Sequence, residues 1–286
     1  MSPTATPAKP AKPKSPPADF SIPPRPDVIT VLFDERRSES PDLKRVARHI
    51  MADAGLSAGM LKAVNSPAFG LARKVTGISA AVDLLGMKNV CAIATGLALR
   101  SITRGRTPPM ERFWDTAEKT ALLCAHLAGK LKAIPRDEAY TYGLLHDCGI
   151  PLLLQRYPNY KDTLAKANSA ETQGFTAVEE ADIGTNHAAI CYFMAKSWFL
   201  PEEISHAVLH HHDLDALEAT GPVSDVARNY IALGHLAGHI HHMSQRASPD
   251  YEWGKFRGDV LRHFGLDDED LTVLIEDAQT FLQTGA

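Results

Sequence analysis

Apolar residues recur along most of this chain every three or four positions, which is the spacing of one face of an α-helix. The segment that follows Pro41 is typical, and its apolar positions are Leu43, Val46, Ala47, Ile50 and Met51. Ser40 and Pro41 before it have the residue types of a helix cap and a first helical position. Strict alternation of apolar and polar residues, the sign of a half-buried strand, is almost absent. The pattern predicts an all-α fold.

The same spacing predicts further helices over residues 57–65, 78–85, 90–102, 110–132, 136–154, 161–171, 176–183, 187–198, 201–211, 223–243, 253–264 and 269–282. Thr176 and Glu179 fit a capping box, and Pro201 suits a first helical turn. Residues 64–70 interrupt the pattern with turn-forming residues, and Gly70 can adopt a positive φ. We expect a sharp chain reversal there.

The first 26 residues differ from the rest of the chain. They are rich in proline and contain Lys9, Lys12 and Lys14, so residues 1–26 are predicted to be a disordered tail. The net charge of the whole chain is −4, which gives no general attraction to nucleic acid or to an anionic membrane. No signal peptide and no apolar run of membrane-spanning length is evident. We therefore expect a cytoplasmic protein.

The four cysteines are far apart in the sequence and form no C-x-x-C pair. They are Cys91, Cys124, Cys148 and Cys191. This spacing indicates reduced, buried thiols rather than a disulfide framework or a zinc knuckle.

The first candidate functional residues, His146 and Asp147, are neighbours in the apolar run of residues 143–154. An ionised carboxylate in such a run needs a partner or a bound cation, so the pair is either half of a metal site or its polar remnant. His187, His211 and His212 stand at the ends of other predicted helices, from which ligands can converge on an inward-facing site. Alternatively, residues 210–213 form a solvated cap on a helix C-terminus.

Another group of histidines follows one helical face. His235, His239 and His242 are spaced i, i+4 and i+7, and His206 and His210 form an i, i+4 pair. Histidines on one helical face at this spacing can bind a single metal ion together. Because no orienting groups are evident beside it, we interpret it as solvated or partner-facing.

Several separated motifs stand out along the chain: residues 61–87, Phe113-Trp114, residues 143–149, 180–187 and 198–201, and His211-His212. Together they resemble the HDOD (HD-related output) domain family. They follow in the family's order over residues 20 to 225. The resemblance implies a helical bundle related to the HD-superfamily metal phosphohydrolases, with an N-terminal helical subdomain over residues 27–110 and an HD-like subdomain over residues 111–225. Residues 226–286 would then complete or flank the bundle.

The resemblance also implies a metal-ligand set, which is His146, Asp147, His187, His211 and His212. Two positions depart from the hydrolytic relatives. Thr116 stands where these have a histidine, and His235 falls near their closing aspartate. A neutral hydroxyl is a poor ligand for a transition metal, and a hydrolytic centre needs ions that activate water and hold phosphate oxygens. We therefore predict no catalytic residue.

HDOD domains occur in bacterial signalling proteins and generally lack a demonstrated hydrolytic activity, so we expect a non-catalytic regulatory module that acts on a protein partner. No cofactor is expected, although a single divalent ion (Fe, Mn, Zn or Ni) could bind; otherwise Asp147 would serve as a polar hub. The alternative function is a metal-dependent phosphohydrolase or phosphodiesterase acting on a nucleotide or cyclic dinucleotide. A nucleotide sensor without turnover also stays open.

Overall fold

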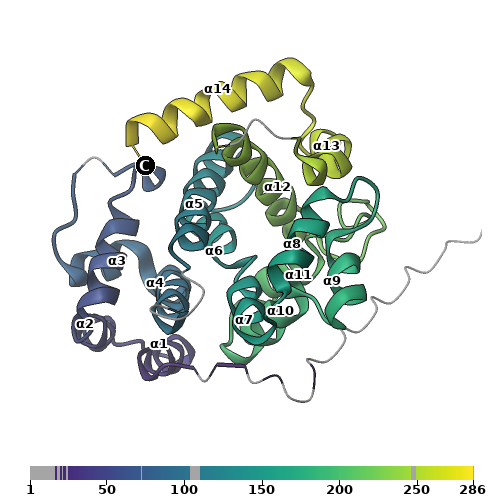
Figure 1. The fold of residues 1–286 in the computed structure, drawn as a ribbon. Helices are drawn as coiled ribbons and strands as arrows, with labels where there is room; N and C mark the ends of the chain where they lie inside the picture. The colour runs from purple at the N-terminus through teal and green to yellow at the C-terminus, as the bar shows by residue number, and fades with distance from the viewer. Residues whose placement is uncertain are drawn as a thin grey trace, which may run out of the picture.

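The chain folds into an assembly of helices (Figure 1). The structure is a computed structural model and describes residues 25–71, 73–103, 110–245 and 249–285, together with Pro17, Phe20, Ile22 and Pro23. No residue in these ranges lies in a β-strand, which confirms the predicted all-α fold. The predicted tail falls outside the described residues, apart from these last four, Arg25 and Pro26.

The helices in chain order are α1 (Asp27–Arg37), α2 (Leu43–Met51), α3 (Ala54–Val64), the 3-10 turn η1 (Pro67–Phe69), α4 (Ile78–Thr103), α5 (Glu111–Leu131), α6 (Arg136–Leu145), α7 (Gly149–Arg156), α8 (Tyr160–Ser169), α9 (Phe175–Ile183), α10 (His187–Ser197), α11 (Glu202–His210), α12 (Asp225–Gln245), α13 (Tyr251–Phe264) and α14 (Asp268–Gly285). In Figure 1, α1 to α4 lie on one side, α5, α6 and α12 in the middle, and α7 to α11 on the other side. The last helix, α14, packs against α5 and α12.

A single large cluster of buried apolar residues extends from Ile29 in α1 to Phe281 in α14. It includes residues of all three predicted parts of the folded chain, so their helices share one core. The division at residues 110 and 225 itself stays a prediction.

Three local predictions need correction. The helix expected over residues 136–154 is two helices, because α6 ends at Leu145 and residues 146–148 form a turn. Asp42, rather than Ser40, caps α2 by accepting a hydrogen bond from the backbone N–H of Arg45. Glu179 takes no part in a capping box, since Gly174 is the N-cap of α9 and makes no side-chain cap.

Two glycines with positive φ mark the chain reversals of the N-terminal part. Gly70 ends η1 with a φ of 63°, as the sequence predicts. Gly86 has a φ of 71° and bends α4 into two segments at an angle of 112°. Helix α1, which no sequence pattern had suggested, buries Ile29, Leu32 and Phe33. Among the described residues, no single helix is both long and apolar enough to cross a membrane.

Candidate metal centre

The centre is built around the turn of residues 146–148 between α6 and α7. Two glycines allow the close approach of its neighbours. A Cβ on Gly143 would lie 2.8 Å from the Cα of Ala121 in α5, and one on Gly149 would lie 2.1 Å from the carbonyl oxygen of His187 in α10. Because the helix is broken here, His146 and Asp147 need not diverge as neighbours on a regular helix would. The turn therefore presents Asp147 to the first residue of α10.

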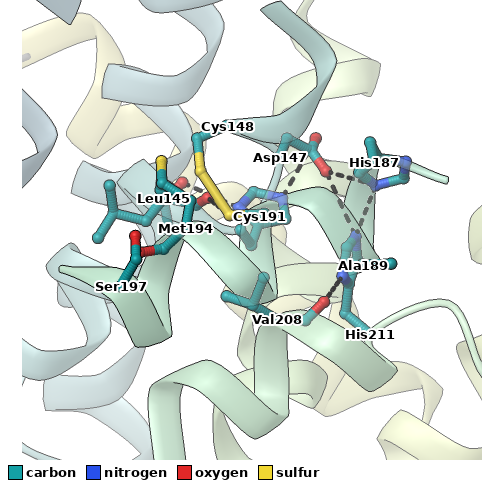
Figure 2. The surroundings of a disulfide bond; sticks show 12 residues. Leu145, Asp147, Cys148, His187, Ala189, Cys191, Met194, Ser197, Val208 and His211 are labelled. Carbon is teal, nitrogen blue, oxygen red and sulfur yellow. Dashed lines mark hydrogen bonds and ion pairs between the residues drawn. A yellow bond between two sulfur atoms is a disulfide. The ribbon is translucent and has the colours of Figure 1, made fainter. Parts of the chain in front are cut away.

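Asp147, His187 and His211 each contribute one possible metal-ligand atom to a close group (Figure 2). Its Oδ1 lies 3.3 Å from Nε2 of His187 and 3.3 Å from Nε2 of His211. The two Nε2 atoms are 3.2 Å apart, so Oδ1 of Asp147 and these two nitrogens form a triangle, called the donor triangle below. One donor atom of His212 lies within 4.8 Å of the other three. The structure thus brings together four of the five predicted ligands.

The fifth predicted ligand, His146, lies on the other oxygen of the same carboxylate. Its Nε2 is 3.4 Å from Oδ2 of Asp147, whereas the donor triangle uses Oδ1. His146 is therefore adjacent to the triangle rather than part of it. Its ring also stacks on Tyr142, with centroids 5.4 Å apart.

The outer nitrogen of each histidine is held by a hydrogen-bond acceptor. Nδ1 of His211 donates to the carbonyl of Val208 at 2.7 Å, and Nδ1 of His146 donates to the carbonyl of Gly143 at 3.0 Å. A carbonyl can only accept, so in the neutral rings the Nε2 atoms carry the lone pairs. Both rings are oriented as metal-binding imidazoles are.

Carboxylates hold the two remaining rings. Glu179, whose side chain is fully buried, accepts from Nδ1 of His187 at 2.7 Å and also from the hydroxyl of Tyr160. Glu252 accepts from Nδ1 of His212 at 2.5 Å and forms an ion pair with Lys255. Such carboxylate–histidine pairs fix the ring and raise its basicity as a ligand.

The carboxylates and imidazoles of this cluster shift one another's pKa values. Burial alone would raise the pKa of Asp147, but the imidazoles of His146, His187 and His211 hold it well below its ordinary value. Burial would likewise lower the pKa of His187, yet the adjacent Glu179 and Asp147 carboxylates raise it to about 10. Burial and the neighbouring His211 lower the pKa of His212 well below its usual range. The two neighbouring carboxylates thus favour the protonated form of His187.

The donor triangle fits a first-row divalent ion. Donors that are each roughly 2.1 Å from one ion lie about 3.0 Å apart at right angles and about 3.4 Å apart at the tetrahedral angle. The observed edges of 3.2, 3.3 and 3.3 Å fall between these two values. One carboxylate with imidazoles suits Zn, Fe, Mn or Ni. The Asp147 side chain is 34% exposed, so the centre is open to solvent on that side.

Neither of the two positions that depart from hydrolytic relatives supplies a ligand atom to the triangle. Thr116 is exposed on α5. His235 turns its Nε2 to the backbone carbonyl of His211 at 2.7 Å and stacks on Phe256, with ring centroids 3.8 Å apart. Burial lowers the pKa of His235 to about 4, so this ring is neutral.

The predicted histidine stripe does not face solvent in the way the sequence indicated. Like His235, His239 packs on α13, where it pairs with Asp250 at 3.0 Å and stacks on Trp253. His210 pairs with Asp213 at 2.7 Å and is buried, as are its neighbours His211 and His212. The alternative of a solvated cap over residues 210–213 is therefore wrong for these three histidines.

The prediction of four reduced cysteines is wrong in this structure for one pair. Cys148 and Cys191 form a disulfide, whereas Cys91 and Cys124 are free and buried. The paired residues are 43 positions apart in sequence, and only the packing of α7 on α10 makes them neighbours.

Sequence reasoning also missed both outer carboxylates. Glu179 was assigned to a helix cap, although its position eight residues before His187 could have suggested a pairing across the α9–α10 turn. Glu252 comes from α13, 40 residues beyond its partner His212, and no sequence signal connects the two.

Comparison with known proteins decides the family. The family model of the HDOD domain matches residues 22–214, which is most of the chain. The chain belongs to the HDOD family. The HDOD match ends before α12, so α13, and Glu252 with it, lies beyond the matched region.

Individual relatives are distant. An uncharacterized protein from Treponema pallidum (strain Nichols) is 26% identical over 64% of this HDOD chain, which spans only 36% of that relative's length. An HDOD domain protein with unknown function from Geobacter sulfurreducens superposes with a TM-score of 0.65 at 21% identity, covering 92% of this chain and 90% of the other. A "Putative signal transduction protein" from Marinobacter aquaeolei VT8 gives a TM-score of 0.61 at 19% identity, covering 92% and 57%. These structures support the all-α HDOD fold.

Proposed function

We propose that this HDOD chain is a non-hydrolytic signal-transduction module whose polar centre holds one divalent ion. One observation carries the proposal: the triangle formed by Asp147, His187 and His211 has the edge lengths of a single ion's ligands, and His235 is engaged elsewhere. An ion bound there would neutralise Asp147 and hold the facing lone pairs together. Asp147, His187 and His211 would hold it, with His146 and His212 beside them.

The ligand set argues against hydrolysis by two ions. Two-ion phosphoesterases need bridging and flanking anionic ligands that keep both cations about 3.5–4 Å apart. Among the described residues, the group that could hold an ion contains a single carboxylate, Asp147. Glu179 and Glu252 are already committed to the outer nitrogens of His187 and His212. The site lacks the negative charge that a second cation requires.

The module would act by binding rather than by turnover. The N-terminal helices and the helices around the centre share one core, so a change at the centre can reach the surface of either part through packed side chains. A protein partner is the expected recipient of the signal. A nucleotide ligand at the open side of Asp147 is compatible with its 34% exposure.

The test is elemental analysis of protein purified without a metal-affinity tag, combined with a panel of phosphomonoesters, dinucleotides and cyclic dinucleotides. We expect one transition-metal ion per chain, its loss in Asp147→Ala, and no turnover. The exposed Asp162→Ala on α8 serves as the matched control and keeps the ion. Turnover that disappears in Asp147→Ala would instead establish the phosphohydrolase alternative. A metal-free wild type that loses only stability in Asp147→Ala would reduce the centre to a polar hub.

A further inference from the structure

The disulfide joins two of the three segments that carry the centre's donors, the Asp147 turn and the first turn of α10. Cys148 directly follows Asp147 in the turn, and Cys191 lies one helical turn after His187 in α10 (Figure 2). Their Cα atoms are 5.8 Å apart, within the usual range for a disulfide. A bond between these sulfurs therefore fixes the Asp147 turn against the first turn of α10.

The same position also accommodates the reduced pair. Sγ of Cys191 lies 3.0 Å from the carbonyl oxygen of Leu145, where a thiol S–H can donate a hydrogen bond. The absence of a side chain at Gly149 lets the carbonyl of His187 approach the Asp147 turn closely, and this approach does not depend on the sulfurs being joined. Reduction would remove one covalent constraint between the two segments.

The other two cysteines show what a thiol without this arrangement looks like. Cys91 and Cys124 are buried, as Cys148 and Cys191 are, but neither has another cysteine as a partner. Their sulfurs lie 3.5 Å from the backbone carbonyl of Leu32 and 3.9 Å from that of Leu233. Neither lies next to a donor of the centre. In a reducing compartment, which the sequence predicts, disulfides in most proteins are transient and regulatory.

We propose that Cys148 and Cys191 are a reversible redox-modification site, oxidised by peroxides and reduced by small thiols, and that the disulfide tightens ion binding at Asp147 and His187. The second half rests on the proposed ion site, whereas the first does not. A bond that holds two ligands in their bound arrangement removes part of the ordering cost of binding.

The oxidation balances with hydrogen peroxide as the oxidant. One thiol loses its proton, the resulting thiolate attacks a peroxide oxygen, and the O–O bond breaks; the departing hydroxide takes up that proton, so that a sulfenic acid and one water form. The second thiol attacks the sulfenic sulfur, the S–O bond breaks, and the disulfide and a second water form. The two sulfurs lose two electrons in all, and the peroxide gains them. A dithiol reverses the step by thiol–disulfide exchange.

The first test counts thiols in the full chain. Protein is reduced with a phosphine, freed of it, exposed to hydrogen peroxide under native conditions or left untreated, and then alkylated in denaturant and weighed. We expect four labels on the reduced chain and two on the oxidised chain, with a peptide that links Cys148 to Cys191. Four labels after peroxide, or a link that involves Cys91 or Cys124, would overturn the modification site.

The second test compares Zn²⁺ affinity of the two redox states by competition with a chromogenic chelator. We expect the oxidised chain to bind roughly five- to tenfold more tightly. The difference should vanish in Cys191→Ala and persist in Cys124→Ala, a matched buried cysteine outside the centre. Equal affinity of the two wild-type states would overturn the coupling, and this comparison needs no variant to fold.

A chain that binds no Zn²⁺ in either state would contradict the proposed ion site and, with it, the coupling. The redox site would still be decided by the label count, and by hydrogen exchange of residues 187–197, which we expect to slow on oxidation. Exchange that is unchanged while the link forms would show that the bond does not constrain α10.

Discussion

Replacing Glu179 by glutamine tests whether the buried outer carboxylate sets the ligand character of His187. The change keeps the size of the side chain and removes its charge. Glu179 is fully buried and lies 2.7 Å from Nδ1 of His187, so no solvent can replace the lost charge. Gln can still accept from His187, but its amide can also donate to Nδ1, which would move the ring proton to Nε2 and remove the ligand lone pair.

Either orientation weakens the ion site. Loss of an outer-shell partner typically costs about 10- to 100-fold in metal affinity, equivalent to about 1.4 to 2.7 kcal/mol. We expect Glu179→Gln to reduce Zn²⁺ affinity by that factor in a chelator-competition titration. Tyr160→Phe removes only the hydroxyl that also binds Glu179 and should have a smaller effect.

Two controls make the result interpretable. Glu171→Gln changes an exposed carboxylate just before α9 and should leave the affinity unchanged. Calorimetry of Glu179→Gln shows whether the variant is folded at the temperature of the titration. A folded Glu179→Gln variant whose Zn²⁺ affinity stays within twofold of the wild type would refute the assignment of Glu179 as the group that orients His187.

Three further predictions concern packing and charge. Gly149→Ala places a Cβ against the backbone carbonyl of His187 and should lower the unfolding free energy by about 1 to 3 kcal/mol in urea denaturation, whereas Gly254→Ala, in open space on α13, should not. Asp277 of α14 pairs with Lys130 and His126 of α5, and Lys130 lowers the pKa of the Asp277 carboxyl. The stabilising effect of this pairing is therefore present above the unfolded pKa of about 4 and is lost as the pH falls through the folded value. Accordingly, Asp277→Asn should lower the melting temperature slightly at pH 7, and the difference should shrink at lower pH. Burial raises the pKa of Cys91 to about 12, so its thiol should react slowly with iodoacetamide in the native protein at pH 8 and rapidly in denaturant.

The helical pattern could be predicted from the sequence because it is a local property. Apolar spacing gave nearly every helix, and the positive φ of Gly70 followed from residue type. The break between α6 and α7 was missed because the apolar spacing continues through His146 and Asp147. A local signal was available, since Pro151 in the first turn of α7 has no N–H to donate to the carbonyl of Asp147 and so cannot continue a helix from α6.

The residues of the candidate site were likewise predictable only in part. His146, Asp147, His187, His211 and His212 were selected by the family resemblance, and the structure brings the last four within 4.8 Å of one another. Their outer partners come from other elements at distances in sequence that carry no signal, as with Glu252 in α13. The pairing of Cys148 with Cys191 depends on how α7 meets α10, which spacing along the chain does not reveal.

Anomalous diffraction from crystals of the metal-loaded chain, recorded at the absorption edge of the bound ion, tests the central claim most directly. We predict one peak, in contact with Asp147 Oδ1 and with Nε2 of His187 and His211. Two peaks about 3.5 to 4 Å apart at this centre would contradict the claim, because that arrangement belongs to a two-ion phosphoesterase.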